Sequence, residues 1–199
     1  MWIAALGLVL LEPKADLHLM INGWHSSFGD AFFSAITWMG SGWMVLFLFL
    51  IFLFVRVRYA VIFGVGNLLI TLLVQVGKHL LFPHALRPVA YFKGGHPLHL
   101  VEGVHMHLYN SFPSGHSATA FGIFVLLAFI TRKEWLRFLY LMVAVLTAFS
   151  RVYLSQHFMA DAVAGSIIGF AGMWLTVYYF DNRWAGCCHF SILDYLKKR

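Results

Sequence analysis

Long apolar blocks alternate with short polar segments along most of the chain. Five blocks are almost wholly apolar, at residues 43–55, 59–76, 117–130, 135–150 and 162–179. A helix needs about 20 mainly apolar residues to cross the hydrocarbon core of a bilayer. With a few flanking residues, each block is typical of one membrane-spanning helix. The first two blocks are joined only by Arg56-Val57-Arg58, so we expect them to be antiparallel neighbours.

The N-terminal part has a weaker pattern. Met1 to Leu11 is apolar but ends at Glu12-Pro13-Lys14, too short to cross a bilayer alone. We interpret it as a short first span or a helix that dips into the membrane. A cleaved signal peptide is disfavoured, because the segment has no basic start and no clear small-residue cleavage site. From Asp16 to Met39 apolar residues recur at helical intervals, which predicts amphipathic helix at the interface, broken at Asn22-Gly23 and at residues 40–42.

The composition supports a membrane protein. Hydrophobic residues make up 61% of the 199-residue chain and charged residues only 11%, whereas soluble domains have about 45–50% and about 25%. We therefore expect an all-α, polytopic membrane bundle in a single domain over residues 1–199. In this prediction residues 1–42 form a short span and interfacial helices, residues 43–179 form the core, and residues 180–199 form a basic cytoplasmic tail. The oligomeric state is left open.

The net charge of +6 does not indicate nucleic-acid binding, because several basic residues flank apolar blocks. Such residues are typical of interface anchors or of ligands for an anionic substrate. If each of the five blocks crosses once, Arg56, Arg58, the 132–137 connection and the tail share one basic side, which should be cytoplasmic. The loop 79–112 and the segment 151–161 then converge on the outer face. We expect a bacterial inner membrane, with the site facing the periplasm.

The long loop 79–112 is polar and contains six histidines, three prolines and a Gly-Gly pair. Long loops are commonly functional. A metal site among these histidines is disfavoured because their spacing matches no usual ligand pattern. Glu102 is interpreted as a solvated charge in preference to a headgroup contact. The adjacent Cys187 and Cys188 predict neither an ordinary disulfide nor a metal site.

The strongest chemical signal lies between the last two apolar blocks. Residues 150–161 place Arg151, His157 and Asp161 at a depth where charge is costly, which favours a functional role. His157 and Asp161 are four residues apart, so a helix would put them on one face. The carboxylate would then fix the tautomer of the imidazole and leave its other nitrogen free to react. The alternative is a purely structural ion pair.

Other parts of the chain supply an anion site on the same face. Lys78, Arg87 and Arg151 provide positive charge, and arginine's planar fork suits phosphate oxygens. Pro113-Ser114-Gly115-His116 leads directly into an apolar helix, and helix N-termini bind phosphate readily. Gly115 allows close approach of the backbone.

Two histidines complete a phosphoryl-transfer site. Such a reaction needs an attacking group, charge stabilisation and protonation of the departing oxygen. We assign the attack to His157, oriented by Asp161, and the proton transfer to His116. The cations take the place of a metal, and no carboxylate cluster suited to one is seen, so we expect no metal and no other cofactor. The prediction is a two-step hydrolysis through a phosphohistidine.

Pro113-Ser114-Gly115-His116 and Ser150-Arg151-x5-His157-x3-Asp161 resemble the second and third motifs of the type 2 phosphatidic acid phosphatase superfamily. That superfamily contains membrane lipid phosphate phosphatases and vanadium haloperoxidases, and the resemblance covers roughly Tyr59 to Tyr179. It implies a six-span bundle in which Met1 to Leu11 belongs to a first span. It also implies that His157 is the nucleophile, that Asp161 supports it and that His116 is the general acid. The phosphate ligands that it implies are Lys78, Arg87, Ser114, Gly115 and Arg151.

The first motif of the family is a lysine followed, usually after six residues, by Arg-Pro. In this chain the matching residues are Lys78 and Arg87-Pro88, and eight residues separate Lys78 from Arg87. A loop can absorb such an insertion, since doubling loop length costs only about 0.6 kcal/mol. His79 or Lys93 are candidates to replace Lys78 in part.

Together these features predict a phosphatase for a lipid phosphate or diphosphate, with the tail of the substrate in the bilayer. Candidate substrates are undecaprenyl diphosphate, phosphatidylglycerol phosphate, phosphatidic acid and lipid A phosphates, with undecaprenyl diphosphate or a broad range slightly favoured. The expected partners are this substrate and membrane lipids. The alternatives are a lipid phosphotransferase, for example one acting on lipid A, and a non-enzymatic anion carrier. A haloperoxidase is disfavoured, because those enzymes are typically soluble.

Overall fold

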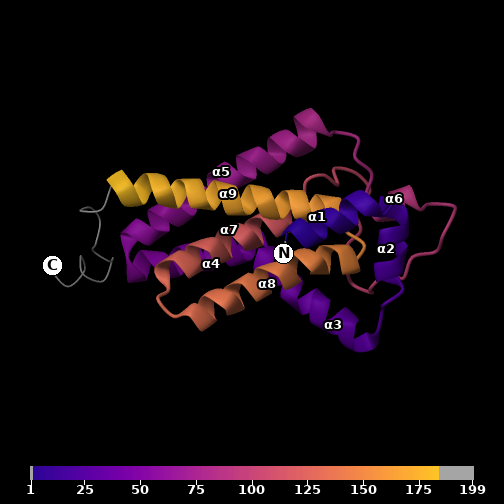
Figure 1. The fold of residues 1–199 in the computed structure, drawn as a ribbon, viewed down its shortest axis with the longest axis horizontal. Coiled ribbons are helices and arrows are strands. Elements are labelled where there is room, and N and C mark those ends of the chain that lie inside the picture. Colours follow the sequence, from indigo (N-terminus) through magenta and orange to yellow (C-terminus); the bar gives the residue numbers. More distant parts are fainter. Residues whose placement is uncertain (1, 184–199) are drawn as a thin grey trace.

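The computed structural model describes residues 2–183, and over these it is helical without a strand. The elements are α1 (Trp2–Leu11), α2 (Lys14–Asn22), α3 (Ser27–Ile36), the 3₁₀ turn η1 (Thr37–Gly40), α4 (Gly42–Val55), α5 (Val57–Val76), the π-helical turn η2 (Gly77–Leu81), α6 (Pro88–Tyr91), α7 (Gly115–Ile130), α8 (Glu134–Tyr153) and α9 (Met159–Arg183). The longer helices run along the bundle, with α5 inclined to the others (Figure 1). The predicted all-α membrane bundle is confirmed. Cys187, Cys188 and most of the basic tail lie outside the described residues.

All five predicted apolar blocks lie in helices. Among the described residues, three helices are long and apolar enough to cross a membrane: Val57–Leu81, Glu134–Tyr153 and Met159–Phe180. A fourth candidate is the pair Ser27–Gly40 and Gly42–Val55, which bends by 52° at the break. Helix α7 is apolar but has only 16 residues. The count of six spans stays a prediction.

Helix α1 has 10 residues, about 15 Å at 1.5 Å per residue. The hydrocarbon core of a bilayer is about 30 Å thick, so α1 is too short to cross it alone. It packs instead on the bundle, where Trp2 lies edge-on to Phe170 and donates a hydrogen bond of 2.9 Å to Ser166 Oγ.

The amphipathic segment 16–39 forms two helices and a turn, and the predicted breaks are where the chain bends. Helix α2 ends at Asn22, and the bend between η1 and α4 falls at Ser41. Ser26 and Ser41 cap the following helices by accepting hydrogen bonds from Gly29 N and Met44 N. Helix α2 buries Leu17 and Ile21 against α8 and α9.

Helix α9 packs closely on α7 because small residues face the contact. Gly165 and Gly169 are one helical turn apart, in the small-xxx-small pattern that lets membrane helices approach. A Cβ on Gly169 would overlap the carbonyl oxygen of Ala118, and one on Gly165 would overlap that of Ser114. This contact fixes the start of α9 beside the start of α7.

The chain segments predicted to converge do so at one end of the bundle. The ends of α5 and α8, the starts of α7 and α9, and the short helices α2 and α6 gather there, opposite the C-terminal end of α9 (Figure 1). The loop after α6 also covers this end. The polar residues of three distant segments therefore meet in one place.

Candidate active site

A pocket of about 570 Å³ lies at this end of the bundle. Six of the eight predicted site residues line it, namely Lys78, Arg87, Gly115, His116, Arg151 and His157. The other two, Ser114 and Asp161, are buried behind the pocket wall. The structure thus brings together residues that the sequence separates by up to 83 positions (161 − 78).

His157 lies in the segment between α8 and α9 and is only 2% exposed. Burial lowers the pKa of the His157 imidazole to about 4, and Arg87 and Arg151 act in the same direction. The hydrogen bond and the charge of Asp161 oppose that shift. The ring is therefore neutral at neutral pH, which is the form that can attack an electrophile.

Asp161 lies in the first turn of α9, whereas His157 precedes that helix. The expectation that both residues share one helical face is therefore wrong. The chain turns at Phe158, whose N–H donates a hydrogen bond of 3.0 Å to Asp161 Oδ2, a capping contact at a helix start. The same oxygen lies 3.5 Å from His157 Nδ1, so the predicted pairing is present at the outer limit of a hydrogen bond.

Ser111 is the closest side-chain partner of Asp161. Its hydroxyl donates a hydrogen bond of 2.5 Å to Asp161 Oδ2, and its Oγ lies 3.5 Å from His157 Nδ1. The sequence places Ser111 at the start of the cluster that leads into His116, but sequence analysis assigned it no role. It lies two positions before Pro113, at the end of a loop that offers no periodic pattern.

Gln156 forms hydrogen bonds with Arg87 and Arg151, and sequence analysis assigned it no role. Its Oε1 accepts hydrogen bonds from Arg87 Nη1 at 3.1 Å and from Arg151 Nη2 at 3.4 Å. Arg87 also donates to the Tyr109 carbonyl at 3.0 Å, and Arg151 donates to Thr37 Oγ1 at 2.7 Å. Burial lowers the pKa of the Arg87 guanidinium, and the charge of Asp161 opposes this. The position of Gln156 next to His157 is the signal that sequence reasoning could have used.

The segment between Lys78 and Arg87 begins with a change of helix type. Lys78 lies in the π-helical turn η2, where Phe82 N donates to Gly77 O at 2.9 Å. A π turn winds one extra residue into a helix, often at functional sites. Lys78 lines the pocket, and its Nζ lies 4.0 Å from where a Cβ on Gly115 would stand. His79 and Lys93 are not among the residues that line the pocket, so neither replaces Lys78 there.

The start of α7 presents the second motif. Ser114 caps the helix: its Oγ accepts hydrogen bonds from Ser117 N at 3.4 Å and from Ser117 Oγ at 2.8 Å. Its own N–H donates to the Asp161 carbonyl at 3.0 Å. Gly115 and His116 are the first two residues of the helix, where backbone N–H groups have no partner within the helix and favour anions.

The loop after α6 forms the outer wall of the pocket. Glu102, Gly103, Val104, His105 and His107 line the pocket from this loop. Glu102 is thus exposed, as expected, and it also faces the cavity. Burial lowers the pKa of His107, and nearby Arg87 and His105 add to that effect.

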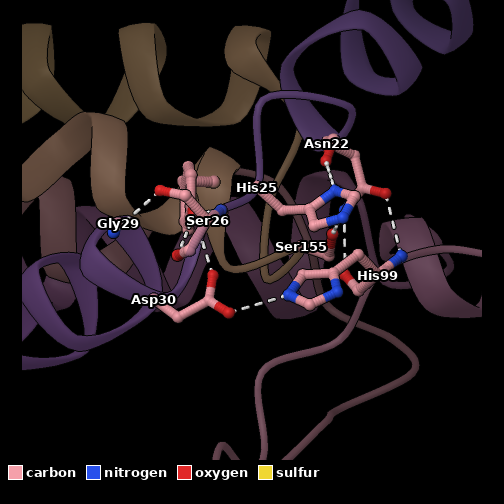
Figure 2. A network of polar contacts seen from close by, with 8 residues as sticks. Asn22, His25, Ser26, Gly29, Asp30, His99 and Ser155 are labelled. Atoms are coloured by element: carbon pink, nitrogen blue, oxygen red, sulfur yellow. Dashed lines mark hydrogen bonds and ion pairs between the residues drawn. The ribbon is translucent and has the colours of Figure 1, made fainter.

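A polar network outside the pocket holds this loop to the N-terminal helices (Figure 2). His99 Nε2 lies 2.9 Å from Asp30 Oδ2, and the His99 ring stacks on His25 with centroids 4.2 Å apart. Asn22 bonds the backbone of His99 in both directions, at 2.8 and 2.9 Å. Tyr153 OH donates to Asp30 Oδ1 at 2.8 Å, which ties the network to the end of α8.

Comparison with known proteins identifies a family whose members share this sequence and fold. A profile of the PAP2 superfamily matches residues 57–185. The chain is 31% identical over 182 residues, 86% of its length, to a lipid A 4'-phosphatase of Bacteroides thetaiotaomicron, of which the match covers 77%.

Two solved structures are similar. The crystal structure of Aquifex aeolicus LpxE matches with a TM-score of 0.72 and 25% identity, over 82% of this chain and 94% of that one. A PAP2-type phosphatidylglycerolphosphate phosphatase from Bacillus subtilis matches with a TM-score of 0.68 and 22% identity, over 91% and 92% of the two chains, and shares the fold. The chain belongs to the PAP2 superfamily and is a membrane phosphatase of that superfamily.

Proposed function

We propose that the protein removes phosphate from a membrane lipid phosphate or diphosphate in a metal-independent reaction through a phosphohistidine. The observation that carries this proposal is the shared pocket, which His116, His157 and three cationic side chains line together. Within this proposal the chain is one phosphatase domain. Its site faces the outside of a bacterial cytoplasmic membrane.

In the first step Nε2 of neutral His157 attacks the phosphorus atom. An N–P bond forms and the bond from phosphorus to the lipid oxygen breaks. His116 enters this step as the imidazolium, which the negative charge of the bound phosphate stabilises, and gives its proton to that oxygen. Asp161 and Ser111 lie on the Nδ1 side of His157, which leaves Nε2 for the attack. Asp161 also stabilises the positive charge that the ring gains.

In the second step His116 takes a proton from a water molecule whose oxygen attacks the same phosphorus. The N–P bond breaks, inorganic phosphate leaves, and both histidines return to their starting state. Throughout, Lys78, Arg87 and Arg151 stabilise the negative charge on the phosphoryl oxygens. Gln156 keeps the two guanidinium groups in place.

The pocket's position supports a lipid substrate. It lies where the apolar helices α5, α7, α8 and α9 begin or end, so an acyl tail can stay among the apolar helices while the phosphate reaches the cations. The named relatives, a lipid A 4'-phosphatase and a phosphatidylglycerolphosphate phosphatase, support the same class.

The test uses purified protein in detergent and a panel of lipid phosphates and diphosphates that includes phosphatidic acid, phosphatidylglycerol phosphate, undecaprenyl diphosphate and lipid A. Phosphate release should persist in excess EDTA. Rapid quenching with a ³²P-labelled substrate should trap label on the protein that is lost in acid and kept in alkali, as phosphohistidine is. His157→Ala should abolish both release and label.

Three results would contradict the proposal: no release from any lipid, strict dependence on a divalent ion, or full release by His157→Ala. Hydrolysis in H₂¹⁸O should place ¹⁸O in the released phosphate, whereas transfer of the label to an added lipid acceptor would identify a phosphotransferase. Sidedness is tested with Lys93→Cys and Arg132→Cys in a chain whose Cys187 and Cys188 are serine. A membrane-impermeant maleimide should label only the first in intact spheroplasts.

A further inference from the structure

Helix α2 presents a polar stripe to the segment that carries His157. The stripe consists of Lys14, His18 and Asn22, which are spaced by four positions and so lie on one face of the helix. His18 and Asn22 are only 1% and 7% exposed. The phosphate chemistry uses none of the three, and none of them lines the pocket. Any part that the stripe plays in the reaction is therefore exerted through another residue.

Both buried members of the stripe meet at one hydroxyl group. His18 Nε2 lies 3.2 Å from Ser155 Oγ, and Asn22 Nδ2 donates a hydrogen bond of 3.2 Å to the same oxygen. Figure 2 shows Asn22 joined to Ser155 and to the backbone of His99. Ser155 is itself only 1% exposed. Its hydroxyl group is therefore held inside the protein by two side chains of α2.

Ser155 has a backbone conformation that is unusual for serine. Its φ is 53°, in the left-handed region that is costly for a residue with a Cβ. Ser155 N donates to Val152 O at 3.0 Å, and Gln156 N donates to Arg151 O at 2.9 Å. These two bonds form a Schellman motif at the end of α8, in which glycine is the usual left-handed residue. With serine at this position, the turn needs support from side-chain contacts.

This turn sets the position of His157. Gln156 and His157 follow Ser155 directly, and His157 N donates to Arg151 O at 3.1 Å. The backbone angles of Ser155 thus decide where the two following side chains point. If the turn relaxed, the imidazole of His157 would shift relative to Asp161 and to the bound phosphate.

The stripe also packs on the other side of His157. The Phe158 ring lies edge-on to the His18 ring, with centroids 5.3 Å apart. Lys14 Nζ lies 5.2 Å from the centroid of the same phenyl ring. Helix α2 therefore contacts the chain both before and after the predicted nucleophile.

His18 is suited to a hydrogen-bonding role and not to proton transfer at neutral pH. Burial lowers the pKa of its imidazole to about 4, although the charge of Asp161 opposes this shift. The ring is therefore neutral at neutral pH. It is also stacked on Phe92 with centroids 5.8 Å apart, which fixes its orientation toward Ser155.

We propose that His18 and Asn22 are positioning residues: by bonding the Ser155 hydroxyl, they hold the left-handed turn that places His157 for attack on phosphorus. This inference rests on the proposed phosphatase function. Both residues precede residue 57, where the PAP2 match begins. The site thus depends on a helix outside the matched region.

The first experiment compares Ser155→Ala with Ser155→Gly. Both variants lose the hydroxyl group, but glycine adopts a positive φ without steric cost. Ser155→Ala should lower kcat by about tenfold to a hundredfold, because a misplacement of about 1 Å at a reacting group can cost a hundredfold. Ser155→Gly should keep a kcat about threefold or more above that of Ser155→Ala. KM and the inhibition constant of inorganic phosphate should change less than kcat in both variants.

The second experiment varies His18. His18→Leu removes both ring nitrogens at similar volume and should lower kcat more than it changes KM. His18→Gln keeps an amide that can bond the Ser155 hydroxyl, so it should restore much of the loss. When His18→Leu is combined with Ser155→Gly, its effect on kcat should be smaller than in the wild type, because residues in contact are not additive.

Met20→Ala is the matched control, because Met20 lies on the same helix and is 49% exposed. Its kcat should stay at the wild-type value. All rates are referred to the folded fraction, measured by size exclusion and thermal unfolding in detergent. If His18→Leu does not fold, the comparison of Ser155→Ala with Ser155→Gly decides.

The outcomes separate this inference from the proposed function. If wild type releases phosphate but Ser155→Ala and Ser155→Gly lose kcat equally, the turn does not place His157 and the inference is wrong. An effect of His18→Leu that is the same with and without Ser155→Gly also refutes it. In both cases the phosphatase remains. If wild type releases phosphate from no lipid, the proposed function fails and this inference fails with it.

Discussion

Ser111 lies closer to Asp161 than His157 does: its hydroxyl is 2.5 Å from Asp161 Oδ2, while His157 Nδ1 is 3.5 Å from that oxygen. Phe158 N–H is a third partner at 3.0 Å. The carboxylate is therefore held by a serine and a backbone amide, and the imidazole lies against a group whose position is already fixed. Asp161 in turn limits how the ring can rotate.

We expect Ser111→Ala to lower kcat much more than it changes KM, because the variant leaves the cations in place and loosens the carboxylate behind His157. The free energy of unfolding should also fall, by about 1–3 kcal/mol, the cost of removing a hydrogen bond to a buried charged group. Steady-state kinetics and thermal unfolding in detergent measure the two effects.

Ser166→Ala is the control, because Ser166 is equally buried on α9 but bonds the Val163 carbonyl, away from the pocket. Its kcat should stay at the wild-type value. A Ser111→Ala variant with unchanged kcat would show that the serine has no part in placing the carboxylate.

The lowered pKa of His157 predicts the acid limb of the pH profile. The ring must be neutral to attack, and burial lowers its pKa to about 4. As pH falls, the limb assigned to His157 should therefore appear near pH 4 and not near the ordinary value of about 6.5. The hydrogen bond and charge of Asp161 raise this pKa, so Asp161→Asn should move the limb to still lower pH.

The measurement is kcat/KM against pH for wild type and Asp161→Asn with one substrate, whose own titration is the same in both profiles. The variant should also have a lower kcat with a similar KM, since an amide can set the wrong tautomer. A limb that moves to higher pH in Asp161→Asn would refute the assignment.

The network in Figure 2 predicts a role for His99 in loop placement. His99→Ala removes the contact with Asp30 and the ring stack on His25. KM should rise by about two- to tenfold, as for one partly exposed charged hydrogen bond, and kcat should change less. Trypsin should also cut faster after Lys93, at the start of the same loop.

The exposed His96 in that loop gives the matched control, His96→Ala, which should leave both KM and the cleavage rate unchanged. Equal effects of the two substitutions would mean that the loop is not held through His99. Asp30→Asn should reproduce the effect of His99→Ala, because it weakens the same contact from the other side.

Because α9 packs closely on α7, we expect a substitution at their contact to lower stability without changing kcat. Gly169→Ala inserts a methyl group against the Ala118 carbonyl, and overpacking of this kind costs about 1–3 kcal/mol. The midpoint of thermal unfolding should fall, while kcat of the folded fraction stays near wild type. Gly42→Ala, where a Cβ meets nothing within 4 Å, should not lower the midpoint.

The sequence predicts much of this molecule, because its strongest signals are local. Apolar blocks give the long helices, and the motifs around His116 and His157 place those residues at helix starts. Lys78 lines the pocket despite its spacing, and the segment between it and Arg87 is a π turn followed by a loop. The expected loop insertion is in part a π turn, and no pattern of apolar residues distinguishes an α turn from a π turn.

The partners that sequence analysis missed act across long separations. Ser111, Gln156 and Thr37 reach the site through tertiary packing, and a serine or glutamine in a polar loop has no periodic signature. The pairing of His157 with Asp161 was predicted from helical spacing, yet it arises from a helix start at Met159. The pattern of apolar and polar residues predicts the helices. The contacts between helix ends depend on how those helices pack, which the pattern does not show.

The bend at Ser41 divides the chain into a supporting part and a reacting part. All the charged groups and histidines predicted to act on phosphate lie on its C-terminal side, whereas Thr37 on its N-terminal side accepts a hydrogen bond from Arg151. The segment before the bend therefore helps to position a predicted phosphate ligand without supplying one itself.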